Sequence, residues 1–208
     1  PDLLSVRGSP GVVSHQEYVI VAGGISTDDN TVHDGIEVLN WMENSHWRRA
    51  SIKIPVPMYD FTPIISDDHL LIVGYSYRNV YKGVYRLPIA NITSSIDEQH
   101  NSATSFRWTE LTAVTHSCTA VVPGSSPPVI VGGWNHSNKT STADIKMYNN
   151  SDHSWRSVGS LLSPKNFVAV AAVDNAIVIG GCIKGGYKAE RKSSSLTTVE
   201  LGEAELLH

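Results

Sequence analysis

Several groups of residues in this chain are of the types found in enzyme active sites, but none has the spacing that such a site requires. The segment 26–35 carries Asp28, Asp29 and Asp34, yet their spacing differs from that of an EF-hand calcium loop, so we expect a solvated loop. The nine histidines form no HxH or HExxH pair, and the Ser–His neighbours lie outside any GxSxG turn. Residues 180–188 lack the GxxxxGK[ST] pattern of a phosphate loop. The sequence therefore predicts no catalytic residue, no metal site and no cofactor.

Composition and charge narrow the classes of partner. The 208 residues carry a formal net charge of −4, so the basic footprint of a general nucleic-acid binder is missing. No apolar stretch is long enough to span a membrane. We therefore expect a protein partner, and neither nucleic acid nor a membrane.

The two cysteines bear on the compartment. Cys118 and Cys182 have no CxxC or CxH neighbour, which argues against a disulfide framework and a structural zinc site. Two free thiols suit a cytoplasmic protein. Four N-x-S/T sequons keep an extracellular location open as the alternative. Their asparagines are Asn91, Asn135, Asn138 and Asn149.

An apolar run ending in a glycine pair occurs four times, and we call it the glycine-pair motif. It ends in Gly23–Gly24, Gly132–Gly133 and Gly180–Gly181, and in a degenerate copy Tyr75 follows Gly74. The copies are about 50 residues apart, a period typical of repeat architectures.

The residues around each motif predict four short strands. A second apolar run and a polar turn precede the motif, and this order predicts a hairpin. Because both runs are continuously apolar, we expect these strands to be covered on both faces. A polar loop and a third, alternating run follow, which predicts a half-exposed strand. These third runs span 36–39, 84–87, 145–148 and 196–201. Trp47, Trp108 and Trp155 then mark a fourth strand in three units. Four strands in about 50 residues make one propeller blade, in which the glycine pair would allow a sharp turn near the axis.

The run 129–133, followed by Tyr148 and Trp155, resembles the kelch repeat. The resemblance implies an all-β fold, a β-propeller of kelch-like four-stranded antiparallel blades. About four blades would be present, near residues 9–51, 59–110, 116–158 and 166–208, with 1–8 as the tail of a preceding blade. Kelch propellers usually close with more blades, so we expect an incomplete ring. The copies depart from the pattern at Leu39, at Tyr75 and in an insert near 89–105.

The resemblance also implies where binding occurs. Kelch-like adaptors usually grip partners with the loops after the glycine pairs, here 25–34, 76–83, 134–143 and 182–195, and with the links 55–60, 111–116 and 162–166. Aromatic and basic loop residues are common interaction hot spots. The candidate binding residues are Tyr77, Arg78, Trp134, His136, Lys184 and Tyr187. For Tyr75 and Trp134, packing between blades is the alternative.

These features predict a non-catalytic protein–protein interaction module, the recognition part of a larger adaptor or scaffold. Two alternatives stay open. One is a carbohydrate-active propeller enzyme of the oxidase or epimerase type, and the other is a secreted glycoprotein propeller.

Overall fold

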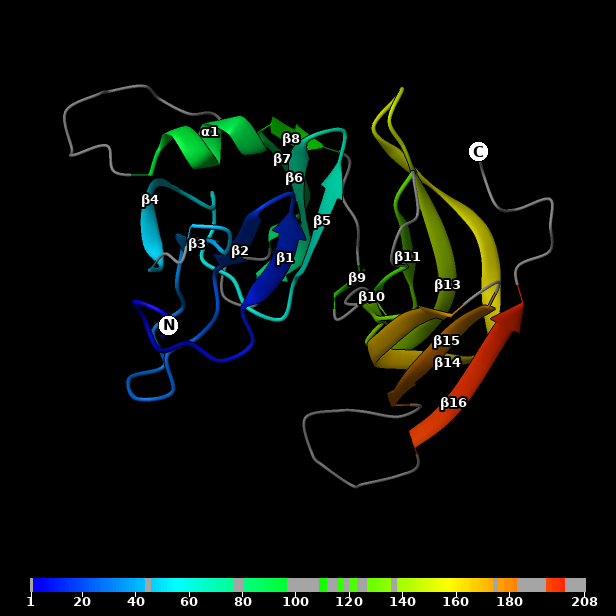
Figure 1. The fold of residues 1–208 in the computed structure, drawn as a ribbon. Coiled ribbons are helices and arrows are strands. Elements are labelled where there is room, and N and C mark those ends of the chain that lie inside the picture. The colour runs from blue at the N-terminus through cyan, green and yellow to red at the C-terminus, as the bar shows by residue number, and fades with distance from the viewer. Residues whose placement is uncertain are drawn as a thin grey trace. The chain divides into compact units, whose positions relative to one another are not determined.

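The computed structural model of this protein describes residues 2–43, 46–76, 81–96, 109–111, 116–117, 120–122, 127–135, 138–173, 176–182 and 194–200. Antiparallel sheets dominate it (Figure 1), which confirms the predicted all-β class. The chain divides into two compact units, Pro1–Ala113 and Val114–His208.

The first sheet of the first unit is an antiparallel meander of four strands. They are β1 (Gly11–His15), β2 (Tyr18–Ala22), β3 (Gly35–Asn40) and β4 (Arg48–Lys53), paired in chain order. His15 pairs with Tyr18, so a two-residue turn joins β1 to β2, where the sequence predicts a hairpin.

The second sheet repeats this order. Its strands are β5 (Thr62–Ser66), β6 (His69–Ser76), β7 (Tyr81–Pro88) and β8 (Thr109–Leu111). The β5–β6 turn is Asp67–Asp68, and both residues have positive φ, 47° and 57°, as a tight hairpin turn requires. In β6, the side chains from Leu70 to Val73 are at most 1% exposed. The strand is therefore covered on both faces, as its continuous apolar sequence predicts.

A short helix, α1 (Ile89–Ser94), begins the insert that the sequence placed near 89–105. Ile89 and Ile92 are buried in the core of the first unit. Just beyond the helix, the Ser95 carbonyl accepts a hydrogen bond of 3.1 Å from the Ser51 amide, and Ile96 forms a bridge with Ala50. The insert thus satisfies backbone groups on β4, the edge strand of the first sheet, and protects that edge from pairing with other chains.

One apolar core joins the two sheets of the first unit. It includes side chains from β2, β3, β4, β6, β7 and α1, and from the link between β4 and β5. Its buried members are Ile20, Ala22, Ile36, Val38, Ala50, Ile52, Ile54, Val56, Met58, Phe61, Leu70, Ile72, Tyr85, Leu87, Ile89 and Ile92.

The second unit contains one larger antiparallel sheet. Its main path runs through β10 (Ala120–Val121), β11 (Val129–Val131), β13 (Thr140–Asn149), β14 (Ser154–Val173), β15 (Ala176–Cys182) and β16 (Ser194–Glu200). Two further short strands, β9 (His116–Ser117) and β12 (Trp134–Asn135), pair with each other, and β12 also pairs with β13.

The link predicted at 162–166 lies where β14 changes its partner, but it is part of one continuous strand and not a loop. The strand pairs with β13 through its first part and with β15 through its last part. The ladder jumps from Asp144↔Ser160 to Thr142↔Lys165, so Pro164 falls in a stretch of shifted register. Proline has no N–H to donate, but it fits an extended chain where the regular ladder is interrupted.

The glycine pairs turn the chain in two of the four copies. Gly23, Gly24, Gly132 and Gly133 have φ of 61°, 99°, 60° and 110°, in the left-handed region that favours glycine. In the other copies the strand continues instead, through Gly74 to Ser76 in β6 and through Gly181 to Cys182 in β15. Their ladders with β7 and β16 extend over these residues. The turn predicted for every copy therefore holds for the first and third.

At both turns the second glycine donates its amide to the backbone of a distant segment. Gly24 donates to the Met58 carbonyl at 2.9 Å, and Gly133 donates to the Lys165 carbonyl at 2.8 Å. We call each of these contacts a glycine clamp. A Cβ on Gly23 would lie 2.4 Å from the Met58 oxygen, a distance that no real Cβ tolerates. The clamp therefore needs glycine for space as well as for φ.

The first prediction compares Gly23→Ala with Gly159→Ala. Alanine at 23 meets a backbone oxygen and a left-handed φ, so we expect a loss of at least about 2 kcal/mol in the free energy of unfolding. Gly159 lies in β14, where a Cβ would approach Ile145 Cδ1 at an ordinary 3.6 Å, so alanine there should change stability by less than about 1 kcal/mol. Urea unfolding of both variants measures the difference, and equal midpoints would contradict the clamp.

Candidate functional site

Five of the six predicted binding residues lie outside the residues that the structure describes. They are Tyr77, Arg78, His136, Lys184 and Tyr187. The structure therefore leaves their assignment as a prediction. It does describe the whole of loop 25–34 and the base of the loop after Gly133, and the candidate site is built from these two segments.

Trp134, the sixth candidate, lies in β12 at the base of its loop. Its backbone pairs with Ser141 on one side and with Ser117 on the other, and its side chain is half-buried. Ile25 occupies the same place in the first copy, since it bridges Val32 and Gly8. The position is thus part of a small three-stranded base, and the sequence, which assigned Trp134 to a loop, did not predict this pairing.

The same backbone hydrogen bond closes both loops. The His33 amide donates to the Gly24 carbonyl at 2.9 Å, and the Thr142 amide donates to the Gly133 carbonyl at 2.9 Å. Both donors stand at the same distance along the chain from the second glycine. The glycine clamp and this hydrogen bond therefore form the same base in both copies. The two loops on this base have equal length and unrelated sequences.

The tip of loop 25–34 is exposed and ordered by its own side chains. The Asp29 carboxylate accepts a hydrogen bond of 2.9 Å from the Thr31 amide, and Ser26 donates its amide to the Thr31 carbonyl at 2.8 Å. The bonds from Thr31 lower the pKa of Asp29 to about 2. Among the described residues, no group of three or more His, Cys, Asp or Glu side chains has a geometry that could hold a metal ion.

A buried ion pair lies beneath this loop. Arg7 Nη2 contacts Glu37 Oε1 at 2.5 Å, and the two side chains are 1% and 0% exposed. Arg7 Nη1 also donates to the carbonyls of Gly23 and Gly35, at 2.8 and 3.1 Å, and the Leu4 amide donates to Glu37 Oε2 at 2.8 Å. Arg7 therefore ties the N-terminal segment to both ends of the loop.

The sequence did not predict this pair. The third run of each unit was expected to be half-exposed, but Ile36, Glu37 and Val38 are all at most 1% exposed. The sign of this pair in the sequence was the acidic Glu37 between two apolar neighbours. Its partner Arg7 comes from a segment that was expected only to be a tail, so the pairing could not be derived from spacing.

Comparisons with known proteins bear on the fold. No family model matches the sequence, and no curated protein matches it. Among solved structures, the chain is similar to one described as "Structure of YjhT", with a TM-score of 0.63 and 11% sequence identity. The match covers 84% of this chain and 59% of that one, so this chain spans well under two thirds of the solved structure. At this identity the likeness concerns the fold.

The only helix among the described residues, α1, is six residues long, and no helix in that part of the chain could cross a membrane.

The second prediction concerns the buried pair. Glu37→Ala leaves the Arg7 guanidinium buried without its carboxylate, and such a loss costs about 3–5 kcal/mol. The Lys53–Asp34 pair, at 3.2 Å with side chains 65% and 37% exposed, is the control, because Lys53→Ala should cost about 0–1 kcal/mol. Urea unfolding compares the two variants. Equal destabilisation would show that the buried Arg7–Glu37 pair contributes no more to stability than an exposed ion pair.

Proposed function

We propose that this chain is a non-catalytic protein-interaction module, part of a kelch-type propeller whose loops after the glycine pairs recognise a partner. The observation that carries the proposal is the common base of the loops 25–34 and 134–143. Both bases have the same clamp and the same closing hydrogen bond. The clamp and the closing hydrogen bond are repeated, whereas the loop sequences are not. The loops are therefore the variable part, as in binding scaffolds.

Two further features support the propeller part of the proposal. The first unit has two four-stranded antiparallel meanders in the same order, and β1 of one contacts β5 of the next. The likeness to a longer solved β structure fits a chain that supplies part of a larger assembly of sheets. A ring of blades, their number and the attachment to an adaptor belong to this proposal.

The binding part rests on the contents of the loops. Trp134 is a half-buried aromatic at a loop base, held by strand pairing on both sides of its backbone. Because this pairing fixes the backbone, the indole is presented from a constant place, and aromatic side chains dominate interaction hot spots. The expected partner is a protein, and we expect the cytoplasm as the compartment.

The third prediction uses site-specific photo-crosslinking. A benzoylphenylalanine is placed at Trp134 or at Tyr187, and at Val158 as the control. Val158 is 42% exposed in β14 and lies outside the predicted binding loops and links. In extracts that contain the partner, we expect one discrete protein adduct from Trp134 and Tyr187, and none from Val158. Adducts that are as frequent from Val158 would contradict recognition by the loops.

A further inference from the structure

Two large apolar side chains project from the turn that follows β3, at the end of the first sheet opposite loop 25–34. Trp41 and Met42 are 57% and 67% exposed. Tyr18 pairs with Asn40 at this end of the sheet, whereas Ala22 pairs with Ile36 at the end near the loop. We call Trp41 and Met42 the turn knob. It lies outside every segment assigned to binding above.

The knob is held in place before any partner arrives. The Trp41 amide donates to the Glu17 carbonyl at 3.0 Å, and the indole Nε1 donates to the Gln16 carbonyl at 3.3 Å. The Met42 amide donates to Asn40 Oδ1 at 3.0 Å. These bonds fix the indole against the neighbouring hairpin turn while most of its surface stays exposed. A fixed exposed tryptophan is a typical anchor for a partner.

Acidic residues lie next to the knob, because Glu43 follows Met42 and the Glu17 carbonyl accepts the Trp41 amide. Burial raises the pKa of Tyr18, and the charges of Glu17 and Glu43 raise it further, so both carboxylates act on this end of the sheet. Arg48 offsets part of that charge through its 3.6 Å contact with Glu43.

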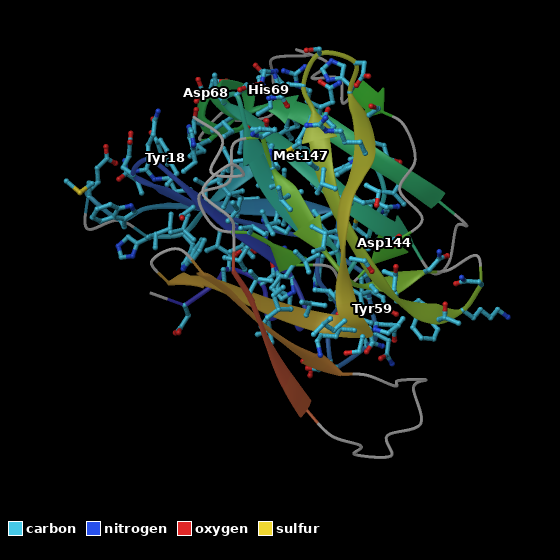
Figure 2. All side chains as sticks on the ribbon, turned by 90° about the vertical axis from the view of Figure 1, so that its right-hand side faces the viewer. Tyr18, Tyr59, Asp68, His69, Asp144 and Met147 are labelled. Carbon is cyan, nitrogen blue, oxygen red and sulfur yellow. The ribbon has the colours of Figure 1, made fainter. Side chains whose placement is uncertain are left out.

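The neighbouring hairpin turn adds Asp67 and Asp68. Asp68 is 83% exposed on its side chain and lies 3.3 Å from His15, which ends β1. Figure 2 shows Tyr18, Asp68 and His69 toward one end of the first unit. Arg86 contacts His69 at 3.2 Å, so this cation faces the same turn. The three turns at this end therefore carry more acidic than basic side chains, with an apolar knob among them.

From this arrangement we propose that the turn knob docks a basic, apolar-containing peptide segment of another protein. An aliphatic side chain of the segment packs on Trp41 and Met42, and its lysines or arginines face Glu17, Glu43 and Asp68. Tryptophan suits this partner because its ring face also attracts cations. Methionine suits it because its flexible side chain adapts to different aliphatic groups. The proposal adds a second surface to the proposed function and does not depend on it.

The test measures fluorescence anisotropy of a fluorescein-labelled peptide that alternates leucine and lysine, against the full chain. The matched probe has glutamate in place of every lysine. We expect the lysine peptide to bind and the glutamate peptide not to bind. Trp41→Ala should weaken binding by at least about tenfold, and the double variant Glu17→Gln with Glu43→Gln should also weaken it. Val158→Ala, which shortens an exposed apolar side chain of the second unit, should leave it unchanged.

Four results would overturn the proposal. Equal binding of both peptides would mean that charge plays no part in binding. If the Trp41→Ala variant bound the lysine peptide as well as the unchanged chain does, the contact would be only electrostatic. Unchanged binding by Met42→Gln, which adds no charge and needs no buried group to move, would exclude the knob independently of folding. A concentration-dependent dimer that Trp41→Ala abolishes would assign the knob to a second copy of this chain. Urea midpoints of the variants confirm that each is folded.

Discussion

The close approach of two backbones at the glycine clamp is the constraint on which the first sheet depends. Gly24 is enclosed from two sides: its amide donates to Met58 in the following link, and a Cβ on it would lie 3.0 Å from Arg7 Cβ and from the Gly8 oxygen. Only a residue without a side chain fits between these two segments. The clamp thereby fixes the exit of β2, the start of loop 25–34 and the path of the link to β5.

The Arg7–Glu37 pair acts on the same place. A buried ion pair seldom adds net stability, because desolvation of two charges offsets their attraction. Here the guanidinium also donates to the carbonyls of Gly23 and Gly35, so it fixes the geometry of the loop as well as the charge balance. In the second unit the register places Lys146 opposite Ile130, as Glu37 is opposite Val21 in the first. The first and third copies therefore share the clamp and differ in the polar groups beside it.

Much of the fold could be predicted because local patterns encode it. The hairpins at 11–22 and 62–76 follow from apolar runs and turn residues, and the class follows from their repetition. Contacts between distant segments could not be predicted. Glu37 is buried where Arg7 reaches it, helix α1 buries Ile89 and Ile92 in the core of the first unit, and β14 continues through Pro164 where the ladder shifts. Trp134 was predicted to lie in a loop, but its backbone pairs in β12 with Ser117 and Ser141, which are distant in the sequence. The turn knob was not predicted, because a Trp–Met pair after an apolar strand also suits a core.

Amide hydrogen exchange at the second glycines measures the strength of the two clamps. We expect slow exchange for Gly24 and Gly133, because each amide is held by a carbonyl of a distant segment. Asp28 is the reference: its amide contacts only the Ser26 hydroxyl, at 3.4 Å in an exposed loop, and should exchange quickly. Exchange of Gly24 and Gly133 as fast as that of Asp28 would contradict the clamp, and with it the common base of the two loops.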